Sequence, residues 1–422
     1  MISLAYALLW IFVFSMPWER ILVLPGIAIV PRVTGGLALG ITLFAVVVSG
    51  RLRRWHGFHV AAVLFWIWAG ANLLFFHSGV RLPAKFWTYG QLLLVVWMIW
   101  ELAPSERRLR GLLTAYVFGA YIAAIDTLLI YRTQAAALRR FAAGGGDPND
   151  LAMVLALGVP MAWYLGMTYR QPVLAWVCRV YLPLAVVAIG LTGSRGGMVA
   201  TTVALLTVPL SMTRLSPGRL AMSMAMLGVA GALAVAYVPD TIVQRLLTIG
   251  SELEGGRIGG RGKLWEAGLE AFVHKPVAGY GTGHYRQAIF PILAGASQVA
   301  HNSYISVLVE QGIVGFLLYM TMLLSVFRAV LKLPVLERRF AIVVLATLGV
   351  AMLPLTWEDR RAVWVVLALL LGFSQARVAD TRGAARQPLP PESVPVTARP
   401  RTRRALGRPA VPHLNDAQDV RA

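Results

Sequence analysis

The stretch Phe58–Phe76, FHVAAVLFWIWAGANLLFF, contains no acidic residue, lysine or arginine and is long enough as a helix to cross the hydrocarbon core of a bilayer. Apolar runs of similar character recur along the chain. Hydrophobic residues make up 58% of its 422 residues and charged residues only 14%, a composition that soluble domains do not show. The sequence therefore predicts an all-α, polytopic membrane protein.

About twelve of these runs are predicted to be transmembrane helices, within a helical domain that covers residues 1–376. Residues 377–422 form a basic tail rich in proline and arginine, which is expected to be disordered. The predicted spans are Leu4–Met16, Val33–Val48, Phe58–Phe76, Phe86–Trp100, Leu112–Ile130, Leu151–Met167, Val173–Gly190, Gly197–Leu210, Leu220–Val238, Tyr304–Val326, Phe340–Thr356 and Val363–Phe373.

Arginine clusters beside the helix ends predict the orientation. Residues 51–54 and 107–110 are rich in arginine, and basic residues of this kind stay in the cytoplasm. Both termini are therefore expected to be cytoplasmic, which makes the long polar loop at residues 239–303 extracytoplasmic. The net charge of +20 follows largely from this topology and from the tail, for which we expect contact with anionic membrane lipids. A nucleic-acid partner is not expected, because the tail lacks interleaved aromatic residues.

The long loop contains RGKLWEAGLEAFVHKPVAGYGTG, residues 261–283. Its periodicity predicts a helix over Lys263–Val273, which Pro276 ends before a glycine-rich turn. Arg261 and Trp265 are four residues apart and fall on one helical face, where a guanidinium group suits phosphate oxygens and an indole can stack on a sugar or an isoprenoid. A solvated basic face is the alternative, and Arg257 is a lesser candidate.

A second candidate is Arg195 in GSRGG, between two apolar spans. An arginine is costly in hydrocarbon, so one at a helix junction flanked by glycines favours an anion or water. Gly196 and Gly197 allow close backbone approach at the start of the next helix, whose amides attract negative charge. A snorkelling interfacial arginine is the alternative interpretation.

The third candidate is AHNSYISVLVEQG, at the start of a long apolar segment. His301, Tyr304 and Leu308 are predicted to share one helix face, with Glu310 nearly opposite. Asn302 has the character of a helix cap. For His301 the alternative is a polar interface residue bonded to a backbone carbonyl.

Metal and nucleotide chemistry have no sequence support, because HExxH, cysteine-cluster and Walker-type motifs are missing. The acidic segment GDPNDLA is predicted to cap a helix through Asp147, Asn149 and Asp150. We therefore expect neither a metal nor a cofactor.

The motifs SRGG, RGKLWEAGLEAFVHKPVAGYGTG and HNSYISVLVEQGIVG, in this order on a polytopic chain, resemble the O-antigen ligase family, which also includes O-antigen and exopolysaccharide polymerases. The resemblance implies a C-type glycosyltransferase of the bacterial inner membrane. Its donor would be an undecaprenyl-diphosphate-linked glycan on the periplasmic face, and its acceptor a glycan or lipid A-core hydroxyl.

By this resemblance Arg195 and Arg261 match the diphosphate-binding arginines, and His301 matches the catalytic base. Trp265 and Tyr304 are expected to line the site, and Arg257 and Asn302 are further candidates for its lining.

Three functions stay open at this stage. A ligase and a polymerase would use the same donor and differ in the acceptor. A lipid or ion transporter would be expected to pair ionisable residues in the middle of the membrane. Only Asp126 lies well inside a predicted span, and Arg195, Arg261 and His301 cluster on the outer side, which favours a transferase over a transporter. We expect this transferase to be inverting and metal-independent.

Overall fold

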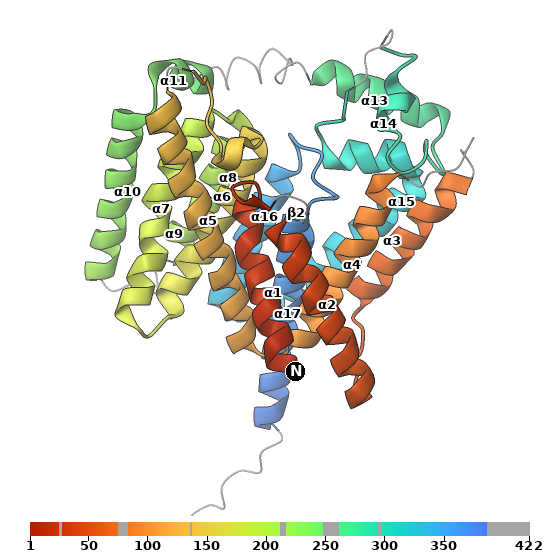
Figure 1. The fold of residues 1–422 in the computed structure, drawn as a ribbon, viewed down its shortest axis with the longest axis horizontal. Helices are drawn as coiled ribbons and strands as arrows, with labels where there is room; N and C mark the ends of the chain where they lie inside the picture. The colour runs from red at the N-terminus through yellow and green to blue at the C-terminus, as the bar shows by residue number, and fades with distance from the viewer. Residues whose placement is uncertain are drawn as a thin grey trace, which may run out of the picture. The chain divides into compact units, whose positions relative to one another are not determined.

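The computed structural model describes residues 1–24, 28–74, 83–135, 137–211, 217–247, 261–293 and 298–385, and within them the protein is helical apart from one short hairpin (Figure 1). The chain divides into two units, Met1–Thr381 and Arg382–Ala422, of which the first carries everything below. Its elements are α1 (Ile2–Ser15), η1 (Met16–Trp18), β1 (Val23–Leu24), β2 (Ala28–Ile29), α2 (Val30–Ser49), α3 (Gly57–Leu74), α4 (Ala84–Leu102), α5 (Glu106–Gln134), η2 (Ala143–Gly145), α6 (Pro148–Thr168), α7 (Pro172–Thr192), α8 (Arg195–Leu205), α9 (Thr207–Ser211), α10 (Pro217–Tyr237), α11 (Asp240–Leu247), α13 (Gly262–His274), α14 (Tyr285–Ile289), α15 (Ser303–Val330), α16 (Val335–Ala351) and α17 (Arg361–Ala385).

The predicted class is confirmed: this is an all-α, multi-pass membrane protein. Seven of the described helices are long and apolar enough to cross a membrane, namely α2, α3, α5, α6, α7, the Leu220–Tyr237 part of α10, and α15. The other predicted spans also lie on helices, but the predicted span Gly197–Leu210 is divided into α8 and α9. The number of twelve spans is not confirmed. α17 continues to Ala385, past the predicted start of the tail.

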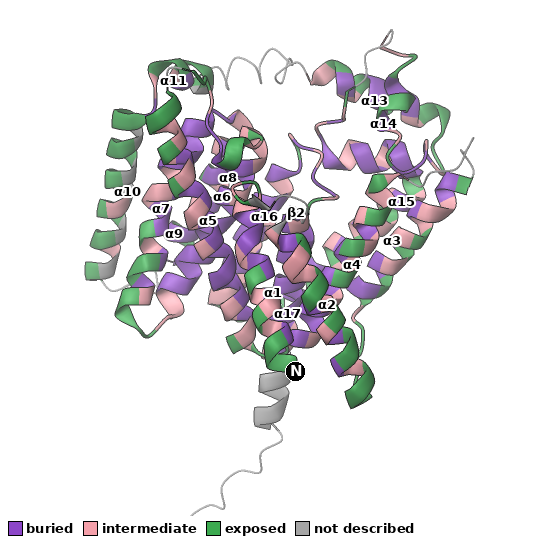
Figure 2. Cartoon of the chain, in the orientation of Figure 1, coloured by how far each residue is buried: buried purple, intermediate pink, exposed green. Residues whose placement is uncertain are grey.

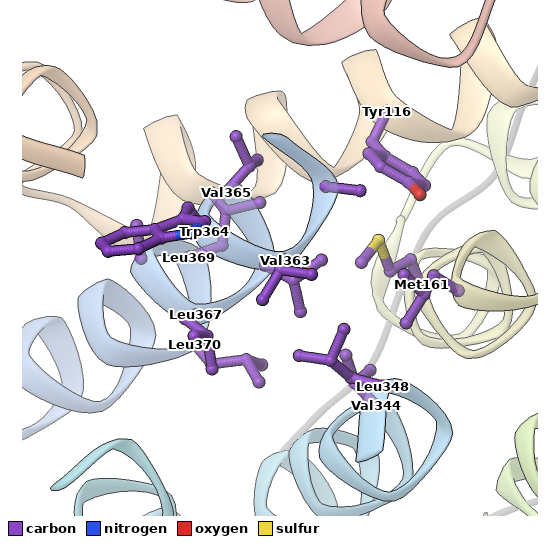
Figure 3. Close-up of a cluster of buried hydrophobic side chains, with 14 of the residues drawn as sticks. Tyr116, Met161, Val344, Leu348, Val363, Trp364, Val365, Leu367, Leu369 and Leu370 are labelled. Carbon is purple, nitrogen blue, oxygen red and sulfur yellow. The ribbon is translucent and has the colours of Figure 1, made fainter. Parts of the chain in front are cut away.

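The apolar residues divide into a core and a surface that suits lipid (Figure 2). α6 is buried along most of its length, whereas α10 shows mostly exposed side chains, such as Val235 at 85% exposure. An apolar side chain exposed on a membrane helix faces hydrocarbon rather than water, so this surface costs nothing in a bilayer. The side chains of Val363 and Leu367 on α17 lie near Met161 of α6 and Leu348 of α16 in the core (Figure 3).

A small lobe covers one end of the helices (Figure 1). We call it the cap, residues 261–293 and 298–300, and we call the end where it lies the cap end. Its helix α13 confirms the predicted helix over Lys263–Val273, and its own core includes Leu264, Ala271 and Tyr285. The glycine-rich part, residues 276–283, is the cap loop.

The cap loop is joined to α15 at a break in that helix. Gly312 has φ +64° and ψ −168°, which interrupts the helix after its first turns and leaves backbone groups there without intrahelical partners. The cap loop supplies the missing partners, so the backbone itself connects the cap to the membrane helix. The bonds are Tyr280 N–H to Val309 O (2.9 Å), Gly281 N–H to Glu310 O (2.8 Å) and Ile313 N–H to Pro276 O (2.8 Å).

Only glycine fits at this junction. A Cβ on Gly312 would lie 2.2 Å from the carbonyl oxygen of Val277, and one on Gly279 would lie 2.5 Å from the Gly312 nitrogen. Both glycines also have positive φ, at +64° and +73°. The GYGTG segment is therefore a structural joint between the cap and α15.

Candidate functional site

Four arginines from distant parts of the chain gather at the cap end. Burial and the guanidinium group of Arg245 lower the pKa of Arg140. Arg261 and Arg195 lower it further, whereas Asp147 opposes them. Positive charges held this close together are suited to a multiply charged anion, which would relieve their repulsion. Arg195 is the first residue of α8, Arg261 precedes α13, Arg245 is on α11 and Arg140 lies between α5 and α6.

Two of these arginines also build the turn between α7 and α8. Arg140 donates from Nε to the carbonyl of Thr192 (2.7 Å) and from Nη2 to Oδ1 of Asn149 (2.7 Å). Arg245 donates from Nε to the carbonyl of Gly193 (3.2 Å), which ends α7 in the left-handed conformation at φ +56°. The turn that presents Arg195 is therefore held by the arginine cluster itself.

The N-terminus of α8 lies close to neighbouring segments because it begins with glycines. Ser194 caps the helix by accepting the N–H of Gly197 (3.2 Å). A Cβ on Gly197 would lie 2.4 Å from the Cβ of Ala152 on α6, and one on Gly196 would lie 2.8 Å from Pro354. The expected close approach is confirmed, and it brings the amide end of a helix, which attracts anions, to the same place as Arg195.

His301 lies just before α15 in an unusual backbone conformation. Its φ of +45° is in the left-handed region, where a residue other than glycine is uncommon and is usually held by its surroundings. Trp265 holds the residue before it, donating from Nε1 to the carbonyl of Ala300 (2.9 Å). Asn302 holds the residue after it, because its side chain caps α15 by accepting the N–H of Tyr304 (3.0 Å).

Ser303 fixes the same segment to the loop between α16 and α17, residues 352–360. Its N–H donates to Met352 O and its hydroxyl to Leu355 O, each at 2.9 Å, and it accepts the N–H of Trp357 at 2.7 Å. The indole of Trp357 in turn donates to Oδ1 of Asp150 (2.9 Å). His301 is thus held between the cap, the α16–α17 loop and the start of α6.

Charges of both signs act on His301. Burial and the guanidinium group of Arg261 lower its pKa. The carboxylates of Asp147 and Asp150 act in the opposite direction, and Arg286 adds to the lowering. The imidazole is consequently neutral near pH 7, the form in which it accepts a proton.

Arg195, Arg261 and His301 all belong to one segment of the chain, at the start of α8, at the start of α13 and before α15. Residues 180–320 match the O-antigen ligase family model. Proteins of this family are enzymes that transfer glycans, as ligases or polymerases, and their substrates are lipid-linked glycans. No curated protein matches the chain.

A cavity of about 1040 Å³ lies between α1, α2, α4 and α6. Its wall along α4 runs from Ala84 to Met98, about 21 Å at 1.5 Å per residue. Its lining includes Asp147 and Asp150, the two carboxylates that act on His301. The cavity therefore extends from the neighbourhood of His301 into the apolar part of the bundle.

The other residues that were predicted to line the site differ in where they lie. Arg257 lies outside the described residues. Asn302 is the helix cap that its sequence position predicted. The hydroxyl of Tyr304 donates to the carbonyl of Gly349 on α16 (3.3 Å), and the indole of Trp265 donates to the carbonyl of Ala300. Both side chains therefore support the segment around His301.

Two predictions about local structure need correction. His301 does not share a helix face with Tyr304, because it has a left-handed backbone and lies before Asn302, the residue that caps α15. In the acidic segment, Asp147 caps α6 as predicted, accepting the N–H groups of Asn149 (2.7 Å) and Asp150 (3.1 Å). The side chains of Asn149 and Asp150 point instead to tertiary partners.

Sequence reasoning missed three groups at the cap end. Arg140 and Arg245 do not belong to a recognisable motif, since Arg140 is one of two adjacent arginines between apolar segments and Arg245 is a single basic residue. The third group is a buried ion cluster that joins Glu310 to Lys85 and Glu358. A carboxylate within an apolar span was the available signal for Glu310.

Proposed function

We propose that the protein transfers a glycan from an undecaprenyl-diphosphate carrier to the hydroxyl group of an acceptor, such as a lipid A-core sugar. In this proposal the cap end faces the periplasm, both termini are cytoplasmic and the chain crosses the bacterial inner membrane twelve times. The observation that carries it is the cluster of four arginines, of which Arg261 lowers the pKa of His301. His301 and three of the arginines, all but Arg140, belong to residues 180–320, which match the O-antigen ligase family model.

The arginines would bind the diphosphate of the donor. Arg195 and Arg261 are the primary ligands in this proposal, and Arg140 and Arg245 add to the positive field. One guanidinium group can donate two parallel hydrogen bonds to phosphate oxygens, and the N-terminal end of the α8 dipole also favours an anion. Charge that builds on the diphosphate as the glycosidic bond breaks is stabilised by these groups, and losing one such donor typically costs about 10²–10³ in rate.

His301 would be the catalytic base. The acceptor oxygen forms a bond to the anomeric carbon while the bond from that carbon to the diphosphate oxygen breaks, and the acceptor proton passes to the imidazole. Attack from the face opposite the leaving group inverts the anomeric centre in a single displacement. The departing diphosphate is a stable anion, so no carboxylic acid is needed to protonate it, in contrast to glycoside hydrolysis.

The cavity between α1, α2, α4 and α6 supports an amphiphilic substrate. Its length along α4 suits a lipid chain, and its lining includes Asp147 and Asp150, which act on the proposed base. A lipid chain in the cavity and a sugar near His301 would be the two ends of one molecule.

A polymerase remains the second candidate, since it would use the same donor and a second lipid-linked glycan as the acceptor. A transporter is less well supported. The buried ions Lys85, Glu310 and Glu358 lie at the cap end rather than midway along the spans: Lys85 is the second residue of α4 and Glu358 precedes α17.

The test replaces His301 in purified protein reconstituted with a lipid-linked glycan and either acceptor. His301→Asn is the sharpest variant, because asparagine tolerates the left-handed backbone that His301 adopts but cannot serve as a base at neutral pH. We expect His301→Asn to lower transfer by at least about 10² while the protein inserts and melts normally, within the range typical of acid–base catalysts.

Two results would contradict the proposal. Full transfer by His301→Asn would remove the imidazole from the mechanism. Uptake of lipid or ions into sealed vesicles, with no glycan product from the wild-type protein, would favour the transporter. Product formed only with the second lipid-linked glycan would identify a polymerase.

A further inference from the structure

Three ionisable side chains meet in a buried cluster at the cap end, outside the set that the proposed mechanism uses. Lys85 Nζ lies 2.8 Å from Glu310 Oε2 and 2.6 Å from Glu358 Oε1, and it donates to the hydroxyl of Ser306 at 3.1 Å. The side chains of Lys85, Glu310 and Glu358 are 11%, 4% and 0% exposed. Groups of this kind are buried only when their partners compensate the loss of water.

The members of the cluster come from parts of the chain that are far apart in sequence. Lys85 begins α4, Glu310 is on the first part of α15, and Glu358 is in the α16–α17 loop. Their separations of 225 and 273 residues mean that the cluster exists only in the folded protein. One ammonium group therefore joins three segments at a single point.

Through Glu310 the cluster holds the cap loop. Glu310 Oε2 accepts the N–H of Gly283 (2.8 Å) in addition to Lys85, and its backbone carbonyl accepts the N–H of Gly281. Asn72 on α3 strengthens the same joint, donating to Glu310 O (3.1 Å) and accepting the N–H of Thr282 (3.4 Å). The side chain and the backbone of one residue thus connect the cap to α15.

Through Glu358 the cluster holds the α16–α17 loop. Glu358 follows Trp357, whose N–H donates to Ser303 and whose indole donates to Asp150. Ser303 is two residues from His301. The two carboxylates therefore act on the two structures that enclose His301, the cap on one side and the α16–α17 loop on the other.

We propose that Lys85, Glu310 and Glu358 are positioning residues, which hold His301 at the correct place between the arginine cluster and Asp147 and Asp150. This inference rests on the proposed function of His301 as the base. In this proposal none of the three side chains contacts the reacting atoms, and each acts on His301 by holding the neighbouring backbone in place. A displacement of about 1 Å at a catalytic group is enough to cost roughly 10² in rate.

A change in the surroundings of His301 is a readout that a purely structural role would not produce. Burial and Arg261 lower the pKa of His301, with Arg286 in the same direction and Asp147 and Asp150 against. If the cluster is removed, His301 becomes more hydrated and moves away from Arg261. Its pKa then rises toward the ordinary value, and the acid limb of the rate profile moves to higher pH.

The experiment compares Lys85→Met with a variant that carries Lys85→Met, Glu310→Gln and Glu358→Gln together. The first leaves two carboxylates without their ammonium group, so it is expected to melt at a lower temperature. The second removes all three charges of the cluster and leaves the neighbouring Asp359, on which Lys85 acts, and it is expected to recover part of the melting temperature. In both, we expect kcat to fall by about 10- to 100-fold with little change in KM for the lipid-linked donor.

The chain contains a matched control at the opposite end of α17. Arg377 joins Glu106 (3.0 Å) and Glu337 (2.7 Å), again one cation between two carboxylates on three helices. The control pair is Arg377→Met and the neutral triple variant Arg377→Met, Glu106→Gln and Glu337→Gln. We expect these variants to lose stability but to keep the wild-type kcat and acid limb.

Titration of His301 by NMR, with histidine labelled at the imidazole carbon, tests the proposal without an activity assay. A higher pKa of His301 in the neutral triple variant at Lys85, with no change in the triple variant at Arg377, is the expected result. An unchanged pKa, or kcat restored together with the melting temperature, would overturn the positioning role. A wild-type protein with no transfer activity would contradict the proposed function instead, and the titration would still decide whether the cluster positions His301.

Discussion

Two ion clusters in the described part of the chain each place one basic side chain between two glutamates, one cluster before α17 and one near its other end, where Glu106 also pairs with Arg110. At the cap end Lys85 joins two glutamates that are 4% and 0% exposed, and at the other end Arg377 joins two that are 16% and 13% exposed. About 24 Å of α17 separates Arg377 from the start of the helix, at 1.5 Å per residue.

The difference lies in what each cation holds. Arg377 holds the first turns of α5 and α16, which are regular helices with their own hydrogen bonds. Lys85 holds a helix that is broken at Gly312 and a loop, residues 352–360, neither of which has a complete backbone ladder. Ion pairs at the end of a regular helix add stability, whereas ion pairs at a helix break fix the position of the backbone. We therefore expect changes at the cap end to alter activity, and changes at the far end to alter stability alone.

The largest effect should come from the helix break. Gly312→Ala puts a Cβ 2.2 Å from the carbonyl oxygen of Val277 and requires alanine to adopt φ +64°. The cap loop would have to leave α15, so we expect transfer to fall by at least about 10². Limited proteolysis of the cap, together with the transfer assay, measures both consequences.

Gly228→Ala is the matched control, because nothing lies within 4 Å of a Cβ at that position on α10. It should behave as the wild type. Normal activity in Gly312→Ala would show that the cap need not be joined to α15.

An intermediate effect is expected from one indole hydrogen bond. Trp265→Phe removes the donor to Ala300 O and leaves a carbonyl beside His301 without its partner. We expect transfer to fall by about tenfold, alongside a loss of about 1–3 kcal/mol in the free energy of unfolding. Transfer rates and chemical denaturation are the measurements.

Trp163→Phe removes an equivalent bond to Ser211 (2.8 Å), in the bundle between α6 and α9. The comparison separates position from stability, since this variant should lose stability but keep its activity. Equal losses of activity in the two variants would contradict the special role of the cap end.

The smallest effect concerns pH. Catalysis by His301 requires the neutral imidazole. Because the pKa of His301 in the folded protein is lowered from the ordinary histidine value of about 6.5, activity should persist into mildly acid solution. It should then fall as the pH drops through this lowered pKa. Asp150→Asn removes a carboxylate that raises this pKa, and we expect the acid limb to move to lower pH. Asparagine can still accept from Trp357, so this hydrogen bond to the loop is retained, whereas the ion pair of Asp150 with Arg360 (3.2 Å) is lost.

Glu337→Gln at the far end should leave the limb unchanged. An upward movement in Asp150→Asn would mean that the carboxylate acts on His301 through structure rather than charge. The kcat profile between pH 5 and 8 gives the answer.

Much of the architecture was predictable from local pattern. Apolar runs such as Phe58–Phe76 predicted helices, and Lys263–Val273 and Asn302 were predicted as a helix and a cap, because periodicity and capping depend on neighbours in sequence. The glycines of the GYGTG segment could be read from the sequence, but their structural role could not. Their partner, Gly312, lies in an apolar run where a single glycine is an ordinary residue of a membrane helix.

The sequence by itself determined that this is a membrane protein of many helices, and it singled out Arg195, Arg261 and His301 through motifs that carry their own chemistry. Only the tertiary structure decided that Arg140 and Arg245 join the cluster, that His301 stands outside the helix with a left-handed backbone, and that Lys85 meets Glu310 and Glu358. The reason is physical: hydrophobic period and helix capping are local properties of the chain. The energy of a charge depends on the groups around it, and those come together only when the chain folds.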